Sequence, residues 1–155
     1  YFIQDIYENT ASGSKILPVD VYVLREGDRL RIQISSIYFA PFSTDFQPGK
    51  EADNQETLRR IAQILNKYSQ HLIVIEGHAV RIYWFNEAEG KREESEILLP
   101  LSQQRAEVVK KILTELGVRE QRMSTVGFGG TEPVVPHSDL DNRWKNRRVE
   151  FILKR

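Results

Sequence analysis

The sequence predicts an α+β domain in which two amphipathic helices cover one face of a single sheet. Two segments, at about residues 51–68 and 103–116, carry apolar residues at helical spacing. Around them lie short apolar runs that alternate with polar residues or continue unbroken, as is typical of strands. The resulting order is strand, helix, strand, helix, strand, loop, strand, which indicates a two-layer sandwich.

Length and composition fit one globular domain and exclude several functions. The chain has 155 residues, of which 40% are hydrophobic and 28% charged, enough for a core of its own. Lys plus Arg and Asp plus Glu number 22 each, so the basic surplus of a nucleic-acid-binding protein is missing. The lack of cysteine excludes disulfides and zinc–thiolate sites. No apolar run approaches the roughly 20 residues of a membrane-spanning helix.

The first part of the chain is predicted as an N-terminal extension or linker with strand character at 1–28, followed by the main domain at 29–155. Alternating apolar residues at 16–24 and 30–39 flank the turn sequence at 25–28. This pattern indicates two strands that pair as a hairpin.

The remaining elements follow from periodicity and from residues that end helices. The first helix is expected over 51–68, after proline and glycine break the chain. An apolar run at 72–75 predicts a buried central strand. The second helix is expected over 103–116, with Gly117 just past its end. Two further strands are expected at 123–128 and 147–153.

Residues 79–100 do not fit this rhythm. Val80, Ile82 and Trp84 alternate with their neighbours, and a charged turn surrounds Gly90. We predict an inserted β-hairpin or another ordered excursion between the central strand and the second helix. Trp84 and Phe85 could stack on sugars or on a partner protein, or they could pack on the domain itself.

Arg105 is the strongest functional lead in the residues themselves. Ser102 is predicted to cap the second helix, which makes Arg105 its third residue. A cation there opposes the helix dipole, and a guanidinium beside free N–H groups is suited to a carboxylate or phosphate. The alternative is that Arg105 lies along the surface or pairs with Glu107 or with an acid of the inserted segment.

His78 follows the central strand and shares a face with Glu76. No nucleophile or second carboxylate accompanies this pair in the sequence, so we expect no enzyme. His71 and His137 are not at ligand spacing from His78, so we expect no metal site, and no cofactor is expected. The glycine-rich run at 127–130 ends a strand and lacks the spacing of a phosphate loop.

Four motifs in a fixed order resemble one protein family. They are Ile75-Glu76-Gly77-His78, Leu101-Ser102-x-x-Arg105-Ala106-x-x-Val109, Gly127-Phe128-Gly129 with Pro133, and Asn146-Arg147-Arg148-Val149-Glu150. With the helices and strands between them, they resemble the OmpA C-terminal domain family, which includes Pal lipoproteins and flagellar-stator MotB domains. The resemblance covers roughly residues 30–155. It implies a non-enzymatic periplasmic domain that binds peptidoglycan non-covalently, through the diaminopimelate of the stem peptide.

The resemblance also implies a two-part ligand site, of which this chain keeps one part. In the family, the Asp of Gly-His-Thr-Asp takes the ligand's ammonium, and the Arg of Leu-Ser-x-x-Arg-Ala takes its carboxylate. The matching positions here are Val80 and Arg105. The family's Thr and Asn positions are Ala79 and Leu98. An inserted acid could fold back to replace the lost Asp, and the candidates are Glu87, Glu89, Glu93, Glu94 and Glu96.

Two hypotheses follow for the function. In the first, the domain anchors a parent protein to the cell wall, with ligand-binding residues Arg105, Ser102, His78, Val80 and Arg148. In the second, the fold has lost diaminopimelate binding and serves as a structural or protein-interaction module, with residues 81–99 or 1–28 contacting a partner. A wall with another diamino acid, such as ornithine, would also explain the altered site.

The resemblance implies a periplasmic location, with attachment to the outer membrane through the rest of the parent protein. The sequence has no signal-peptide pattern. Because it starts at Tyr1 rather than Met, we expect a mature form or a piece of a longer protein.

Overall fold

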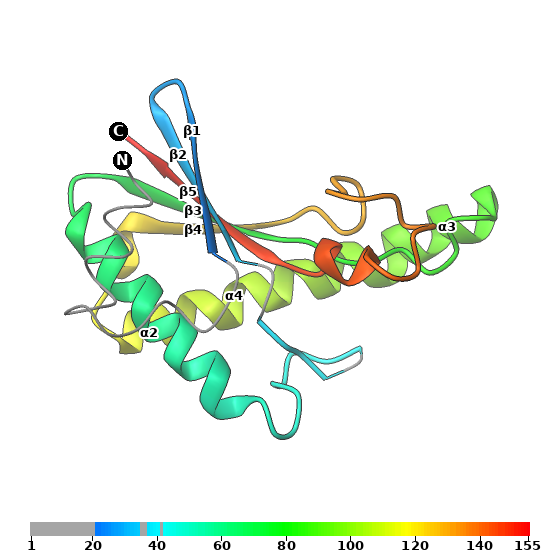
Figure 1. The fold of residues 1–155 in the computed structure, drawn as a ribbon, viewed down its shortest axis with the longest axis horizontal. Coiled ribbons are helices and arrows are strands. Elements are labelled where there is room, and N and C mark those ends of the chain that lie inside the picture. Colours follow the sequence, from blue (N-terminus) through cyan, green and yellow to red (C-terminus); the bar gives the residue numbers. More distant parts are fainter. Residues whose placement is uncertain (1–20, 35–36, 41) are drawn as a thin grey trace.

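The computed structural model describes residues 21–34, 37–40 and 42–155, and it contains one five-stranded sheet (Figure 1). The strand order is β1-β2-β5-β3-β4. Helices α2 and α4 pack on one face of the sheet, so the predicted two-layer α+β sandwich is confirmed. The bounds are β1 Val21–Glu26, β2 Arg29–Ile34, α2 Glu51–Lys67, β3 Leu72–Gly77, α4 Leu99–Glu115, β4 Met123–Gly127 and β5 Val149–Lys154.

The sheet is mixed, and its last strand lies at its centre. β3 and β4 pair in parallel, whereas β1 with β2, β2 with β5 and β5 with β3 pair antiparallel. β1 and β2 form the predicted hairpin, which turns at Gly27 with a φ of 62°. The predicted N-terminal extension therefore contributes β1 to the same sheet as the main domain. Its residues 1–20 lie outside the described part of the chain.

The core lies between the sheet and the two helices, because alternate strand residues face α2 and α4. The intervening residues of the same strands face the other side of the sheet. This arrangement puts the charged side chains Arg31, Glu76 and Glu150 on the face opposite the helices. The core residues include Leu30, Ile32, Leu58, Ile61, Leu65, Ile73, Ile75, Ala106, Val109, Leu113, Phe151 and Leu153.

The inserted segment is helical, so the predicted β-hairpin at 79–100 is wrong. Helix α3, Glu87–Glu93, continues into the π-helix η1, Glu94–Leu98, which runs directly into α4. Asn86 starts this long helix, since its side chain accepts a hydrogen bond from the N–H of Glu89. Figure 1 shows α3 projecting beyond the sheet. The alternation at 80–85 belongs to an irregular segment, residues 79–86, which includes a turn at 84–85 and which we call the strap.

The predicted helix start at Ser102 is also wrong. The helix passes through Pro100, which has no N–H to donate and is normally found in a first turn. A wide turn precedes it, in which the N–H of Leu99 reaches the carbonyl of Glu94. Ser102 consequently lies within the helix, and its hydroxyl donates to the carbonyl of Leu99 at 3.0 Å. The predicted helix end is confirmed, since Gly117 has a φ of 98°.

Short helices complete the domain, η2 at Glu120–Arg122 and η3 at Arg143–Asn146. The buried Arg122 side chain donates to the carbonyls of Leu65, Tyr68 and His71, and so ties the end of α2 to the start of β4. Within the described residues, no helix combines the length and the apolar character needed to cross a membrane.

Candidate functional site

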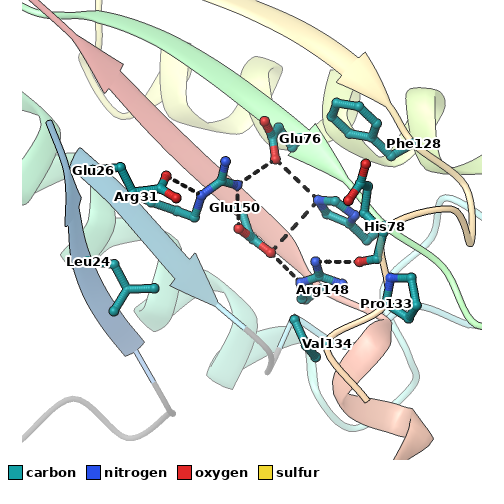
Figure 2. A pocket seen from close by; sticks show the side chains of 11 residues that line it. Leu24, Glu26, Arg31, Glu76, His78, Phe128, Pro133, Val134, Arg148 and Glu150 are labelled. Carbon is teal, nitrogen blue, oxygen red and sulfur yellow. Dashed lines mark hydrogen bonds and ion pairs between the residues drawn. The ribbon is translucent and has the colours of Figure 1, made fainter. Parts of the chain in front are cut away.

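Two hollows adjoin at the end of β3, and they share His78 and Arg148. The smaller, of about 10 Å³, is lined by the apolar residues Ile37 and Phe39 and by Arg105, Arg147 and neighbouring backbone. We call it the Arg105 hollow. The larger, of about 370 Å³, opens on the sheet face opposite the helices and is lined mainly by charged side chains (Figure 2). We call it the charged pocket.

Arg105 is buried and held by backbone carbonyls. Its Nε donates to the carbonyl of Ser43 at 3.1 Å, and its Nη2 donates to the carbonyl of Ala40 at 3.2 Å. The guanidinium carbon lies 4.8 Å from the centre of the Phe39 ring. Arg105 therefore neither lies along the surface nor pairs with Glu107, whose carboxylate accepts a hydrogen bond from Gln103.

The Arg105 hollow is positively charged. Burial and the nearby charge of Arg147 lower the pKa of Arg105 to about 10, so it still carries its proton at neutral pH. Among the described residues, no carboxylate lines this hollow. An anion placed there would meet two guanidinium groups without competition from a protein acid.

The acids of the inserted segment do not line this hollow either. The buried carboxylate of Glu93 accepts hydrogen bonds from the backbone N–H groups of Ile82 and Tyr83. The carboxylate of Glu94 accepts from the N–H of Gly130 at 2.9 Å and from Arg81 at 2.8 Å. Both acids are therefore used to fix the strap and the loop after β4.

Ser102 joins the long helix to the strand ends. Its hydroxyl accepts a hydrogen bond from the N–H of Gly129 at 2.9 Å. A Cβ on Gly77 would lie 2.1 Å from the carbonyl oxygen of Ser102, and one on Gly127 would lie 2.4 Å from the nitrogen of Gln103. The glycines of the sequence motifs thus let β3 and β4 approach the helix backbone. The N–H groups at Ser102 belong to a continuous helix, so they do not form the predicted anion site.

His78 and Arg148 form the wall between the two hollows. The backbone N–H of His78 donates to the carbonyl of Arg148 at 3.0 Å. Its ring stacks on Phe128 with the centroids 5.4 Å apart, and Nε2 lies 3.3 Å from Oε1 of Glu76. The predicted site residues Arg105, His78 and Arg148 are therefore brought together, whereas Val80, which is half-buried, lines neither hollow.

The charged pocket contains a buried ion network that crosses three strands (Figure 2). Nη1 of Arg31 lies 2.8 Å from Glu76 and 2.6 Å from Glu150. Arg148 pairs with the other oxygen of Glu150, and its Nη2 donates to the carbonyl of Glu132 at 2.8 Å. Sequence reasoning missed Arg31 and Glu150. One signal in the sequence could have identified them. Both are charged residues at alternate strand positions, on the side of the sheet that faces away from the core.

The network keeps the Glu76 carboxylate ionised. Burial raises the pKa of Glu76, but the hydrogen bonds with His78 and Arg31 outweigh burial and leave it below its ordinary value. Burial lowers the pKa of Arg31, but the hydrogen bonds with Glu150, Glu26 and Glu76 outweigh this effect and raise it. Arg31 and Glu76 are therefore a charged pair at neutral pH.

Glu76, His78 and Glu150 also have the composition of a metal site, since one ligand atom from each lies within 4.8 Å of the others. The two guanidinium groups already pair with both carboxylates. A divalent cation would have to displace them or share the carboxylates against their positive charge. We therefore assign the cluster to the ion network and not to a metal.

A model of the OmpA family matches residues 38–147. The chain belongs to the OmpA family. The resemblance indicated by the four sequence motifs is thus confirmed. This OmpA-family domain is 37% identical to the peptidoglycan-associated lipoprotein of Mesorhizobium japonicum over 112 residues, which are 72% of the chain and 60% of the relative. It is 33% identical to the lipoprotein of the same name from Agrobacterium fabrum, covering 85% of the chain and 63% of the relative. The chain thus spans about three fifths of these relatives.

Solved structures show the same fold. The cell wall anchor of the T6SS from Pseudomonas aeruginosa superposes with a TM-score of 0.67 at 27% identity, over 86% of the chain and 87% of that structure. The peptidoglycan-associated lipoprotein from Burkholderia pseudomallei gives a TM-score of 0.58 at 30% identity, over 76% and 88%. The periplasmic domain of Helicobacter pylori MotB gives 0.68 at 22% identity, over 86% and 78%, and this match concerns the fold alone.

Proposed function

We propose that this OmpA-family domain is a non-catalytic cell-wall anchor that binds peptidoglycan non-covalently. The Arg105 hollow would take a carboxylate of the stem peptide. The observation that carries the proposal is a buried arginine beside a second, exposed arginine, with no carboxylate from the described residues lining the hollow. Relatives named peptidoglycan-associated lipoprotein, and a neighbour described as a cell wall anchor, support the polymer as ligand. The periplasm is the corresponding location, with attachment through the rest of the parent protein.

The charges of the hollow define which ligand group matters. An acid about 4 Å from an ammonium contributes on the order of 4 kcal/mol at an effective dielectric near 20, before desolvation is subtracted. This contribution corresponds to about three powers of ten in affinity, and Val80 cannot supply it. The site therefore recognises a carboxylate and not the zwitterion as a whole. Amidating that carboxylate should abolish stem-peptide binding, whereas removing the side-chain amine should change it little.

Co-sedimentation with purified sacculi tests the proposal. Arg147 is the best target, because it lines the hollow and its side chain is exposed. Arg147→Gln should lower retention severalfold. Lys154→Gln, which removes one positive charge from the opposite end of β5, is the matched control and should leave retention unchanged. Arg105→Gln should lower retention further. This result is interpreted only if the variant still unfolds cooperatively, which shows that it has kept the fold.

One observation favours a second function. Two donor groups of Arg105 are already used by the carbonyls of Ala40 and Ser43, and the hollow has room for about one water molecule. A filled hollow and an arginine whose donors are already used are the features expected of an OmpA-like domain that serves as a structural or protein-interaction module. In that case the wild-type domain would not sediment with sacculi at physiological salt, and the anchoring proposal would be wrong.

A further inference from the structure

Three neighbouring aromatic side chains on the strap are exposed. The exposed fractions of Tyr83, Trp84 and Phe85 are 44%, 45% and 66%. The Phe85 ring lies 5.5 Å from the Trp84 ring and 6.0 Å from the Tyr83 ring, so the three form one cluster. We call this cluster the aromatic platform. Adjacent exposed rings of this size are typical of surfaces that bind something.

The backbone beneath the platform is fixed by buried acids. Glu93 accepts the N–H groups of Ile82 and Tyr83, at 3.1 Å and 3.0 Å. Gly90 lets the strap approach the helix, because a Cβ there would lie 2.8 Å from the carbonyl oxygen of Tyr83. Burying a carboxylate is costly unless hydrogen bonds compensate. Buried hydrogen bonds thus hold the strap in place, although the largest apolar side chains of the strap remain exposed to solvent.

The platform extends the site described above. The strap begins directly after His78, which lines the Arg105 hollow, and it runs along α3 and η1. These two helices add roughly 18 Å of helix beyond the start of α4. One stem-peptide residue spans at most about 3.6 Å. A stem peptide of a few residues does not cover this length by itself, so the glycan strand that carries the peptide has to run toward the strap for both contacts to form.

The charge of the residues around the platform distinguishes between the polymers and surfaces that it could bind. Residues 81–98 carry three basic and five acidic side chains, which disfavours an anionic lipid surface or a nucleic acid. The backbone of a peptidoglycan glycan strand is built of N-acetylated pyranose rings with apolar C–H faces, and its anionic groups are mostly consumed by the peptide bond to the stem. Flat aromatic rings match such faces. A neutral sugar backbone thus suits both the rings and their surroundings.

We propose that Tyr83, Trp84 and Phe85 form a glycan-binding subsite that stacks on the sugar rings of the peptidoglycan strand. This inference rests on the proposed function, since it assigns the glycan to the strap and the stem peptide to the Arg105 hollow. The domain would then grip the polymer at two places. Avidity from such a pair raises retention on the polymer without changing affinity for a free stem peptide.

Binding to three probes tests the subsite: intact sacculi, glycan strands stripped of peptide by an amidase and then amidated at the freed lactyl carboxylates, and a soluble stem peptide. Trp84→Ala and Phe85→Ala should each weaken retention on sacculi and on stripped glycan by about three- to tenfold. Both should leave stem-peptide binding unchanged. Leu72→Ala is the matched control, because Leu72 is 59% exposed at the opposite end of β3. Circular dichroism should show that all three variants keep the fold.

The outcomes separate the two proposals. Unchanged retention of both aromatic variants would overturn the subsite, as would wild-type protein that binds stem peptide but not stripped glycan. Binding to vesicles of phosphatidylglycerol and phosphatidylethanolamine that is lost in the aromatic variants, without any loss on glycan, would reassign the platform to a membrane and also overturn it. Retention on stripped glycan without stem-peptide binding would instead refute the Arg105 proposal and leave the subsite standing.

Discussion

Replacing Glu150 by Gln should strongly destabilise the domain, although the change conserves side-chain volume. The Glu150 side chain is 3% exposed and pairs with both Arg31 and Arg148. Arg31 keeps Glu76 and Glu26 as partners in the variant. Arg148, with a side chain 4% exposed, would lose its only carboxylate partner among the described residues, and the one oxygen of the new amide could accept from Arg148 or from Arg31 but not from both.

The magnitude follows from the cost of an unpaired buried charge. Breaking a buried ion pair by removing one partner costs about 3–5 kcal/mol. For a domain of this size, 1 kcal/mol corresponds to a shift in Tm of about 2–4 °C. Urea unfolding followed by circular dichroism measures the loss directly. Glu87→Gln is the matched control: Glu87 is 84% exposed and pairs with Lys91 one helical turn away, so it should cost less than about 0.5 kcal/mol.

A double variant shows whether the unpaired arginine is the cause. Adding Arg148→Met to Glu150→Gln removes the stranded charge, so the two losses should not add, and the coupling should exceed about 1 kcal/mol. A loss of less than about 1 kcal/mol for Glu150→Gln alone would refute the reasoning. Strict additivity of the two changes would refute it as well.

Three other predictions use the same structure. The folded pKa of Glu76 lies below its unfolded value of about 4.3, so its contribution to stability is present above that pH and is lost as the pH falls through the folded pKa. Glu76→Gln should therefore flatten the acid side of a plot of Tm against pH. An unaltered curve would contradict this. Gly77→Ala should cost about 2–3 kcal/mol in urea unfolding, because the new Cβ meets the backbone of Ser102, and a neutral result would mean that the helix can shift. Gly90→Ala should displace the strap from the Tyr83 carbonyl and speed proteolysis within residues 79–86, even though alanine favours helix; unchanged cleavage would argue against a fixed strap.

Much of the fold could be predicted because the relevant signals are local. The apolar spacing over 51–68 gave α2, and the runs at 72–75 and 147–153 gave the two central strands. The prediction of a β-hairpin at residues 79–100 was wrong for a physical reason. Its aromatic alternation is that of a strand, but the acids that follow it, Glu93 and Glu94, form hydrogen bonds with backbone groups distant in sequence.

The candidate site was only partly predictable. Arg105 was identified for a reason that the structure contradicts, since the helix does not start beside it. Its real surroundings depend on the carbonyls of Ala40 and Ser43, about 60 residues earlier in the chain, which no local pattern encodes. The ion network was missed because pairing between Arg31 and Glu150 follows from strand order, and strand order is a property of the whole fold.

The central position of β5 has a consequence for how this domain is made. β1 and β2 form one ribbon, β3 and β4 form another, and among the described strands only β5 hydrogen-bonds to both. Of these strands it is also the last to be synthesised. Until it arrives, each ribbon exposes an open edge of unpaired N–H and C=O groups, the kind of edge that invites aggregation. Both edges therefore stay open until β5 has been made, and a break just before residue 149 would leave two separate ribbons and not a trimmed sheet.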